Sequence, residues 1–188
     1  MLQNSQTGRT YARLLYLSSA LTYGVPMSKP SNAVSALQSK IQDYLRQTVG
    51  RCEVLRDGSS SVRYGSARVI ITAHELGQTG RTLVNVFALV VQGTNVTDEL
   101  YGYLMEVNKN VVFGKFFAVE GQRLVVCQET LLGDKMGPEE LHIAVSAVAQ
   151  LADEYDDKIV AKFRGKTMQQ FEDDAGNIAR QWPDLRAP

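Results

Sequence analysis

The sequence has few of the residues from which redox and metal sites are built. Its two cysteines, Cys52 and Cys127, are too far apart for a CxxC pair or a zinc-ligand cluster. We expect both to be reduced thiols inside strands, where cysteine behaves as a small hydrophobic residue. We therefore predict no disulfide, no metal site and no cofactor.

The chain also lacks an excess of charge and any long apolar run. Twenty Lys plus Arg balance twenty Asp plus Glu, so the basic field typical of nucleic-acid-binding proteins is missing. No apolar run approaches the roughly 18 to 20 residues that cross a bilayer. We predict no nucleic-acid partner, no membrane span and a cytoplasmic location.

Acidic residues are absent from the first 42 positions. Acid-poor starts of this kind occur in targeting peptides, but the apolar stretch at 14–21 is short and is interrupted by Ser18 and Ser19. Met27 is also a possible native start. We expect residues 1–30 to be an N-terminal extension, and an appended helix, an upstream translated segment and a targeting segment remain open.

Apolar spacing predicts three amphipathic helices in the main part of the chain. The first begins after Ser31 or Asn32 and ends at Gly50, and the second begins after Asn95 or Thr97 and ends near 108–110. The third begins at Pro138, whose fixed φ suits the first helical position, and runs to about residue 164. A last helix and tail are predicted over 166–188.

Five strands are predicted, at residues 51–56, 62–75, 81–91, 111–119 and 122–132. The third of them is apolar at both parities of the strand alternation, which is typical of a central strand with both faces covered. The order is helix, three strands, helix, two strands and long helix. This order predicts one α+β domain over 31–165 with an antiparallel sheet of about five strands.

Four segments carry a resemblance to a known family. They are Leu104-Met-Glu-Val-Asn-Lys-Asn110, Val111-Val-Phe-Gly-Lys-Phe116, Leu124-Val-Val-Cys127 and the helix from Leu141 to Gly165 with Ala152-Asp153. Over residues 31–165 the chain resembles the bacterial YbjN family, which shares its fold with type III secretion chaperones. The resemblance implies a non-enzymatic protein, often homodimeric, that binds peptides or partner proteins. It implies no catalytic residues.

The last hairpin supplies the candidate binding residues. A turn at Glu120-Gly121 would place Phe117 with Leu124 on one face of the sheet and Phe116 with Val125 on the other. The long helix can cover only one apolar face, so the terminal helices, a second subunit or a client peptide must cover the other. The candidate partner-binding residues are Phe113, Phe116, Phe117, Leu124, Val126, Tyr101 and Tyr103.

Neither histidine belongs to a recognisable catalytic motif. His74-Glu75 begins like the zinc-protease motif HExxH, but position 78 is glutamine and the pair falls on a predicted strand. His142 lies on the long helix without a partner nucleophile. We expect no metal binding at His74 and interpret His142 as solvated or salt-bridged.

Four acidic residues crowd one turn of the long helix: Asp153, Glu154, Asp156 and Asp157. Asp153 and Asp157 are spaced to share a face and hold Mg²⁺. We favour a solvated acidic face, because Glu154 lies four residues before Lys158 in the order that favours an ion pair.

Three functions are compatible with these patterns. The first is a chaperone-like or regulatory module that binds a peptide or protein through an apolar surface. The second is a homodimeric adaptor or assembly factor in which self-association covers that surface. The third, with the least support, is a metal-dependent hydrolase built on His74, His142 and the Asp153 cluster.

Overall fold

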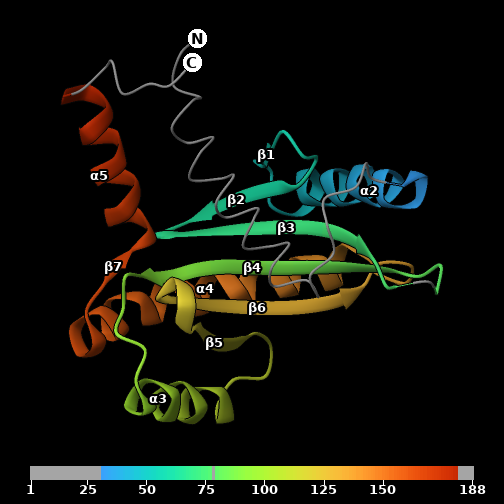
Figure 1. The fold of residues 1–188 in the computed structure, drawn as a ribbon. Coiled ribbons are helices and arrows are strands. Elements are labelled where there is room, and N and C mark those ends of the chain that lie inside the picture. Colours follow the sequence, from blue (N-terminus) through green and yellow to red (C-terminus); the bar gives the residue numbers. More distant parts are fainter. Residues whose placement is uncertain (1–30, 78, 182–188) are drawn as a thin grey trace. The chain divides into compact units, whose positions relative to one another are not determined.

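The computed structural model describes residues 31–77 and 79–181, with side chains to residue 174 (Figure 1). Pro30–Met168 form one compact unit. Helix α5 (Met168–Gln181) belongs, from Gln169 onward, to a second unit and is considered by itself. The expected N-terminal extension, residues 1–30, and the last seven residues of the predicted C-terminal helix and tail lie outside the described residues.

The helices begin and end close to their predicted bounds. They are α2 (Asn32–Thr48), α3 (Asp98–Lys109) and α4 (Pro138–Phe163). The Ser31 hydroxyl oxygen accepts a hydrogen bond from the Val34 N–H, and the Thr97 hydroxyl oxygen accepts one from the Leu100 N–H, both at 3.3 Å. These side chains satisfy donors that have no partner in the first helical turn, which is why the two helices begin where they do.

The strands form one antiparallel sheet in the order β1-β2-β3-β4-β6-β5, and β7 also pairs with β4 (Figure 1). The α+β class and the central position of the third predicted strand, which is β4, are confirmed. The strands are β1 (Glu53–Val54), β2 (Ser60–Tyr64), β3 (Ala67–Glu75), β4 (Thr82–Gln92), β5 (Lys115–Val119), β6 (Leu124–Leu132) and β7 (Lys166–Thr167).

The sheet has seven strands, not the expected five. The stretch predicted as one strand over 62–75 is a hairpin, in which Gly65 and Ser66 turn the chain between β2 and β3 and Tyr64 lies opposite Ala67. Gly65 has a φ of +53°, a conformation open to glycine at little cost. The other addition is β7, whose two residues follow α4.

The last hairpin also differs from its prediction. Its connection is a 3₁₀ turn, η1 (Glu120–Gln122), followed by Arg123 in the left-handed region at φ 55°. Because this connection is longer than the expected turn, Phe117 lies opposite Val126. The pairing has moved by two residues, which keeps every side chain on its predicted face.

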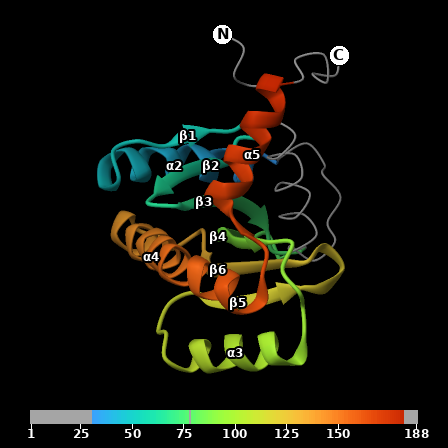
Figure 2. The ribbon, with the colours of Figure 1, turned by 90° about the vertical axis from the view of Figure 1, so that its left-hand side faces the viewer.

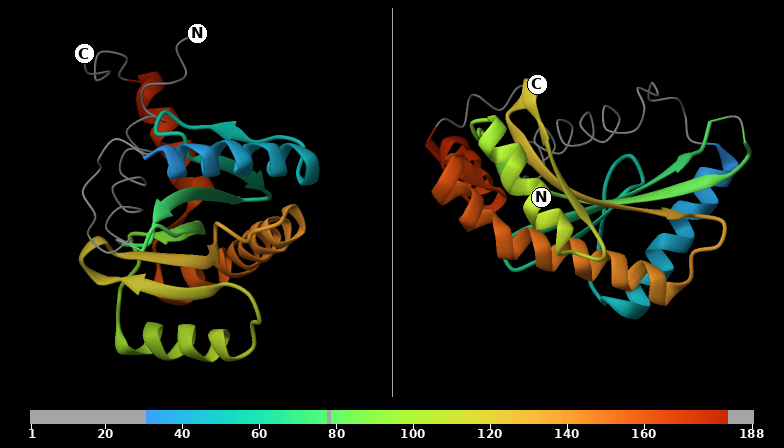
Figure 3. Two further views of the ribbon diagram at one scale, coloured as in Figure 1. Left: turned by 90° about the vertical axis from the view of Figure 1, so that its right-hand side faces the viewer. Right: turned by 90° about the horizontal axis from the view of Figure 1, so that it is seen from below.

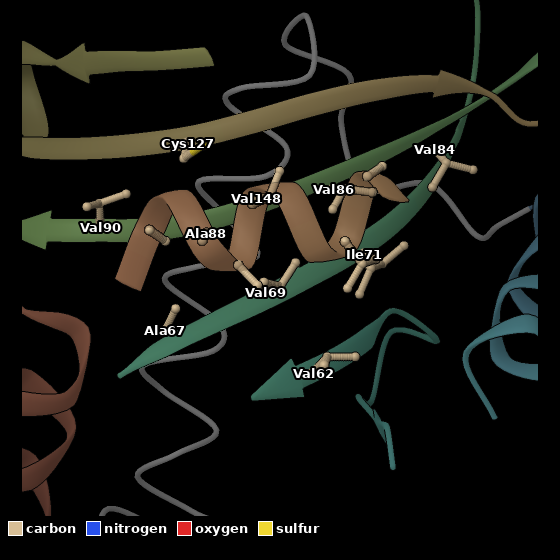
Figure 4. Packing of buried hydrophobic residues seen from close by; sticks show 14 of the residues in the cluster. Val62, Ala67, Val69, Ile71, Val84, Val86, Ala88, Val90, Cys127 and Val148 are labelled. Carbon is tan, nitrogen blue, oxygen red and sulfur yellow. The ribbon is translucent and has the colours of Figure 1, made fainter. Parts of the chain in front are cut away.

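Helices α2 and α4 lie on the same side of the sheet (Figures 2 and 3). Beneath them, alternate residues of β3 and β4, including Val69, Ile71 and Val86, join the core with Val148 of α4 (Figure 4). A bulge in β4 between Leu89 and Val91 interrupts the alternation. For this reason the adjacent residues 90 and 91 both belong to this core.

Both cysteines are free thiols. Cys127 is buried within β6, and burial raises its pKa to about 12, so its thiol stays protonated and unreactive at neutral pH. Cys52 is half-buried and lies just before β1, not inside a strand as predicted. None of the helices described is long and apolar enough to cross a membrane.

Candidate functional site

The sheet face opposite α2 and α4, which we call the second face, carries an apolar group of side chains. In the antiparallel register Ile70 lies opposite Phe87, and Leu89 and Phe117 both lie opposite Val126. Five of the group are 1–5% exposed and Phe117 is half-buried. The group consists of Ile70, Phe87, Leu89, Phe117, Leu124 and Val126.

Helices α2, α3 and α4 do not cover this group. All the buried apolar residues of these three helices belong to the core cluster, and none of the second-face group does. The sheet therefore has two separate apolar surfaces. One is packed under α2 and α4, and the other is largely buried without any contribution from the core cluster.

A row of polar side chains crosses the second face beside the apolar group. Thr72, Asn85 and Thr130 lie opposite one another on β3, β4 and β6. The Thr130 hydroxyl donates to Asn85 Oδ1 at 3.0 Å, and His74 Nε2 lies 2.8 Å from Thr72 Oγ1. We call these four residues the polar row. Asn85 and Thr72 are only 5% and 4% exposed, so the row places directional hydrogen-bonding groups within a largely buried surface.

His74 is a member of this row and not part of a catalytic pair. Burial lowers the pKa of His74, and the charge of Asp57 opposes the shift. Its ring therefore favours the neutral form, which hydrogen-bonds Thr72. His142 lies exposed on α4.

The seven candidate binding residues do not share one surface. Phe117, Leu124 and Val126 lie on the second face. Phe116 is 3% exposed in the core, with its ring centroid 5.4 Å from that of Tyr155. Tyr103 is half-buried, with its ring 5.6 Å from that of Phe163. Phe116 is therefore a core residue, whereas Tyr103 packs against Phe163 and keeps part of its surface exposed.

Tyr101 and Phe113 belong to an exposed apolar group at α3, which we call the α3 patch. Tyr101 is 40% exposed, Met105 69%, Val112 84% and Phe113 46%. Tyr101 and Met105 are one helical turn apart, and the other two residues follow the end of the helix. Sequence reasoning did not select Met105 or Val112, although the four-residue spacing from Tyr101 to Met105 was a visible signal.

The acidic turn of α4 is only partly a solvated face. The Glu154–Lys158 ion pair is confirmed, with 2.7 Å between Oε1 and Nζ. Asp156, in contrast, is 4% exposed and lies 2.6 Å from the Ser66 hydroxyl. Within the part of the chain that the structure describes, no three His, Cys, Asp or Glu residues are grouped to hold a metal ion.

Comparison with known proteins identifies the family. A family model described as T3SS (YopN, CesT) and YbjN peptide-binding chaperone 1 matches residues 35–171. A comparison with curated proteins gave no match.

Comparison with solved structures gave several matches. One is a chain of the HopA1–SchA chaperone–effector complex, with a TM-score of 0.50 and 8% identity over 68% of this chain and 99% of that one. Another, from the ExsC–ExsE complex, has a TM-score of 0.47 and 18% identity over 65% and 96%. The family match spans residues 35–171, which is most of the chain. The protein therefore belongs to this family of type III secretion and YbjN peptide-binding chaperones.

Proposed function

We propose that the protein is a non-enzymatic chaperone that holds an apolar segment of a partner protein on the second face. The observation that carries the proposal is an apolar surface that α2, α3 and α4 leave uncovered, around Phe87 and Val126. Affinity would come from the apolar area that the partner segment itself removes from water, at roughly 25 cal/mol per Å². We place this activity in the cytoplasm.

The layout of the second face suggests the chemistry of the segment it binds. The group around Phe87, Leu89 and Phe117 would contact apolar side chains of the partner. The polar row beside it would orient the segment, because Asn85 and Thr72 hydrogen-bond only in particular directions. A segment with clustered apolar residues next to a polar residue fits both halves.

The test is binding of the full chain to an array of 15-residue peptides that differ in apolar content and arrangement. Phe117→Ser removes apolar area from the second face at its one half-buried residue, and Tyr64→Ser is the matched control. Tyr64 is 47% exposed at the end of β2 and lies at the parity of the opposite face. A second preparation lacks residues 1–26, so that binding is measured with and without this segment.

We expect peptides with clustered apolar residues to bind, the Phe117→Ser variant to bind them at least tenfold more weakly, and the Tyr64→Ser variant to bind normally. Failure of every peptide to bind either preparation would contradict the proposal. Equal losses in the two variants would place the binding surface elsewhere.

A second proposal, homodimerisation, is favoured by the α3 patch. Four large apolar side chains within residues 101–113 are exposed, and exposed apolar surface of this kind often binds a partner. We propose that Tyr101, Met105, Val112 and Phe113 pack against the same patch of a second copy. In this adaptor model, mass measurement in solution should give twice the mass of the chain used, which is 20.8 kDa for the full chain, both with and without residues 1–26. A strict monomer at all concentrations would refute it.

A further inference from the structure

Ser66, at the β2–β3 turn, contacts two carboxylates of α4. Its backbone N–H donates to Asp153 Oδ1 at 2.7 Å, and its hydroxyl oxygen lies 2.8 Å from the same Oδ1 and 2.6 Å from Asp156 Oδ2. The turn is closely seated, because a Cβ added at Gly65 would overlap Asp153 Oδ1. We call Ser66, Asp153 and Asp156 the Ser66 latch.

The Ser66 hydroxyl has too few hydrogens to donate to two ionised carboxylates at once. The Ser66 hydroxyl carries one hydrogen, but its oxygen is within hydrogen-bond distance of two carboxylate oxygens. If that hydrogen goes to Asp153, the 2.6 Å contact with Asp156 is a hydrogen bond only if Asp156 carries a proton and donates it to Ser66. Otherwise a negative oxygen faces a hydroxyl lone pair.

The surroundings of Asp156 favour the protonated form of its carboxyl group. Asp153 Oδ1 already accepts the Ser66 N–H, and Asp156 Oδ1 accepts the Asp157 N–H at 2.6 Å. Burial raises the pKa of Asp156, the hydrogen bonds from Ser66 and the Asp157 N–H act in the opposite direction, and the charges of Asp157 and Asp153 raise it further. Desolvation disfavours the ionised form of a carboxyl group that is 4% exposed.

The basic residues on α4 and on the hairpin that lie close in sequence to Asp156 or Ser66 have other partners or lie on the other face of the sheet. Lys158 pairs with Glu154 and lies 4.4 Å from the centre of the Tyr155 ring. On the strands of the hairpin, Arg63 and Arg68 lie opposite each other at the parity of the second face, on the far side of the sheet from α4. The charges that act on Asp156 from its own helix are both negative.

We propose that the Ser66 latch is a proton-dependent clamp that holds the β2–β3 hairpin on α4 when Asp156 is protonated and loosens when it ionises. The affected strands lie at the β1 edge of the sheet, where β1 itself contributes only two residues. Loosening would therefore release the edge of the sheet and leave the β4–β6 centre paired.

The sign of the pH effect follows from where the proton is held. In the folded protein Asp156 keeps its proton at pH values where an unfolded aspartate, with a pKa of 3.8, has lost it. The stabilisation is complete below about 3.8 and is lost as the pH rises through the higher folded pKa. Above that folded pKa the hairpin edge should exchange its amide hydrogens faster.

The experiment uses the full chain. The side-chain carboxyl ¹³C signal of Asp156 is followed by NMR against pH, and the urea midpoint of unfolding is measured over the same range for wild type, Asp156→Asn and Asp157→Asn. Asparagine at 156 donates an N–H to Ser66 at every pH. Asp157 is exposed, and its replacement is the matched control for loss of one negative charge on the same turn.

We expect Asp156 to titrate above 3.8, and wild type to lose stability relative to Asp156→Asn as the pH rises through that titration. Asp157→Asn should still lose stability as the pH rises, but at a somewhat lower pH than wild type, because one of the charges that raise the pKa of Asp156 is gone. A constant difference between wild type and Asp156→Asn would overturn the proposal. If Asp156→Asn does not fold, the wild-type titration decides alone, since a midpoint at or below 3.8 contradicts the clamp.

Discussion

The two faces of the sheet are built from the same strands but have different chemistry. On the face under α2 and α4, Val69, Val84 and Val86 are fully buried in a continuous apolar core. On the second face the apolar group gives way to the polar row around Asn85. A core face needs only shape and apolar area, whereas a face that must orient a ligand also needs hydrogen-bonding groups at defined positions.

The largest effect should separate Phe116 from Phe117, which are adjacent but lie on opposite faces. Phe116→Ala removes a core ring that contacts Tyr155 and should lower the free energy of unfolding by about 3–5 kcal/mol. Phe117→Ala, at a half-buried position, should cost less stability and should weaken peptide binding about tenfold or more. Urea unfolding and peptide titration measure the two effects. Equal losses of stability would mean that both faces contribute alike to folding.

A second test compares the two ends of β3. Gly65 and Gly77 share a φ of +53°, but a Cβ at Gly65 would overlap Asp153 whereas one at Gly77 would meet nothing within 4 Å. Gly77→Ala should therefore cost about 1 kcal/mol, from backbone strain alone.

Gly65→Ala should cost about 2–4 kcal/mol, because it also disrupts hydrogen bonds that hold the hairpin on the helix-covered side. Thermal or urea unfolding of both variants gives the difference. Similar losses of stability in the two variants would show that Asp153 can move away from the added Cβ at no cost in free energy.

A third test concerns the polar row. Thr130→Val removes the hydrogen bond to the buried Asn85 Oδ1 and should cost about 1 kcal/mol. Adding Asn85→Leu should recover part of this loss, because the amide then no longer needs a partner. The double-mutant cycle is measured by urea unfolding, and peptide binding is measured in parallel. Strict additivity would mean that the two side chains do not depend on each other.

The smallest effect on stability should come from the α3 patch. Met105→Glu changes a side chain that is 69% exposed and should alter the free energy of unfolding by no more than about 0.5 kcal/mol. If the patch joins two copies, the same change should reduce the mass in solution to that of one chain. Lys109→Glu on the same helix, exposed but outside the apolar patch, is the control and should leave the mass unchanged.

Local signals predicted the elements well where they were strong. The capping hydroxyls of Ser31 and Thr97 and the proline at 138 marked the starts of α2, α3 and α4, because each satisfies or removes a free backbone donor. The Gly65-Ser66 turn was missed, since two small residues within a β-rich stretch are compatible with either a strand or a hairpin. The bounds of α4 were predicted to within one residue.

The candidate site was predicted less completely than the fold. Alternation placed Phe117, Leu124 and Val126 on one face correctly, but alternation cannot identify which face the helices cover. Phe116 was therefore included among the binding candidates although it lies in the core. The role of Asp156 was not predicted, because its partner Ser66 is 90 residues away in the sequence.

By itself the sequence determined the order of helices and strands, their amphipathic faces and the resemblance to a chaperone family, because these depend on residues close together along the chain. Only the tertiary structure decided which sheet face became the core, which aromatic side chains were packed away and which carboxyl group lost its contact with water. Those outcomes depend on strand register and on how helices seat against the sheet, which bring together residues distant in the sequence.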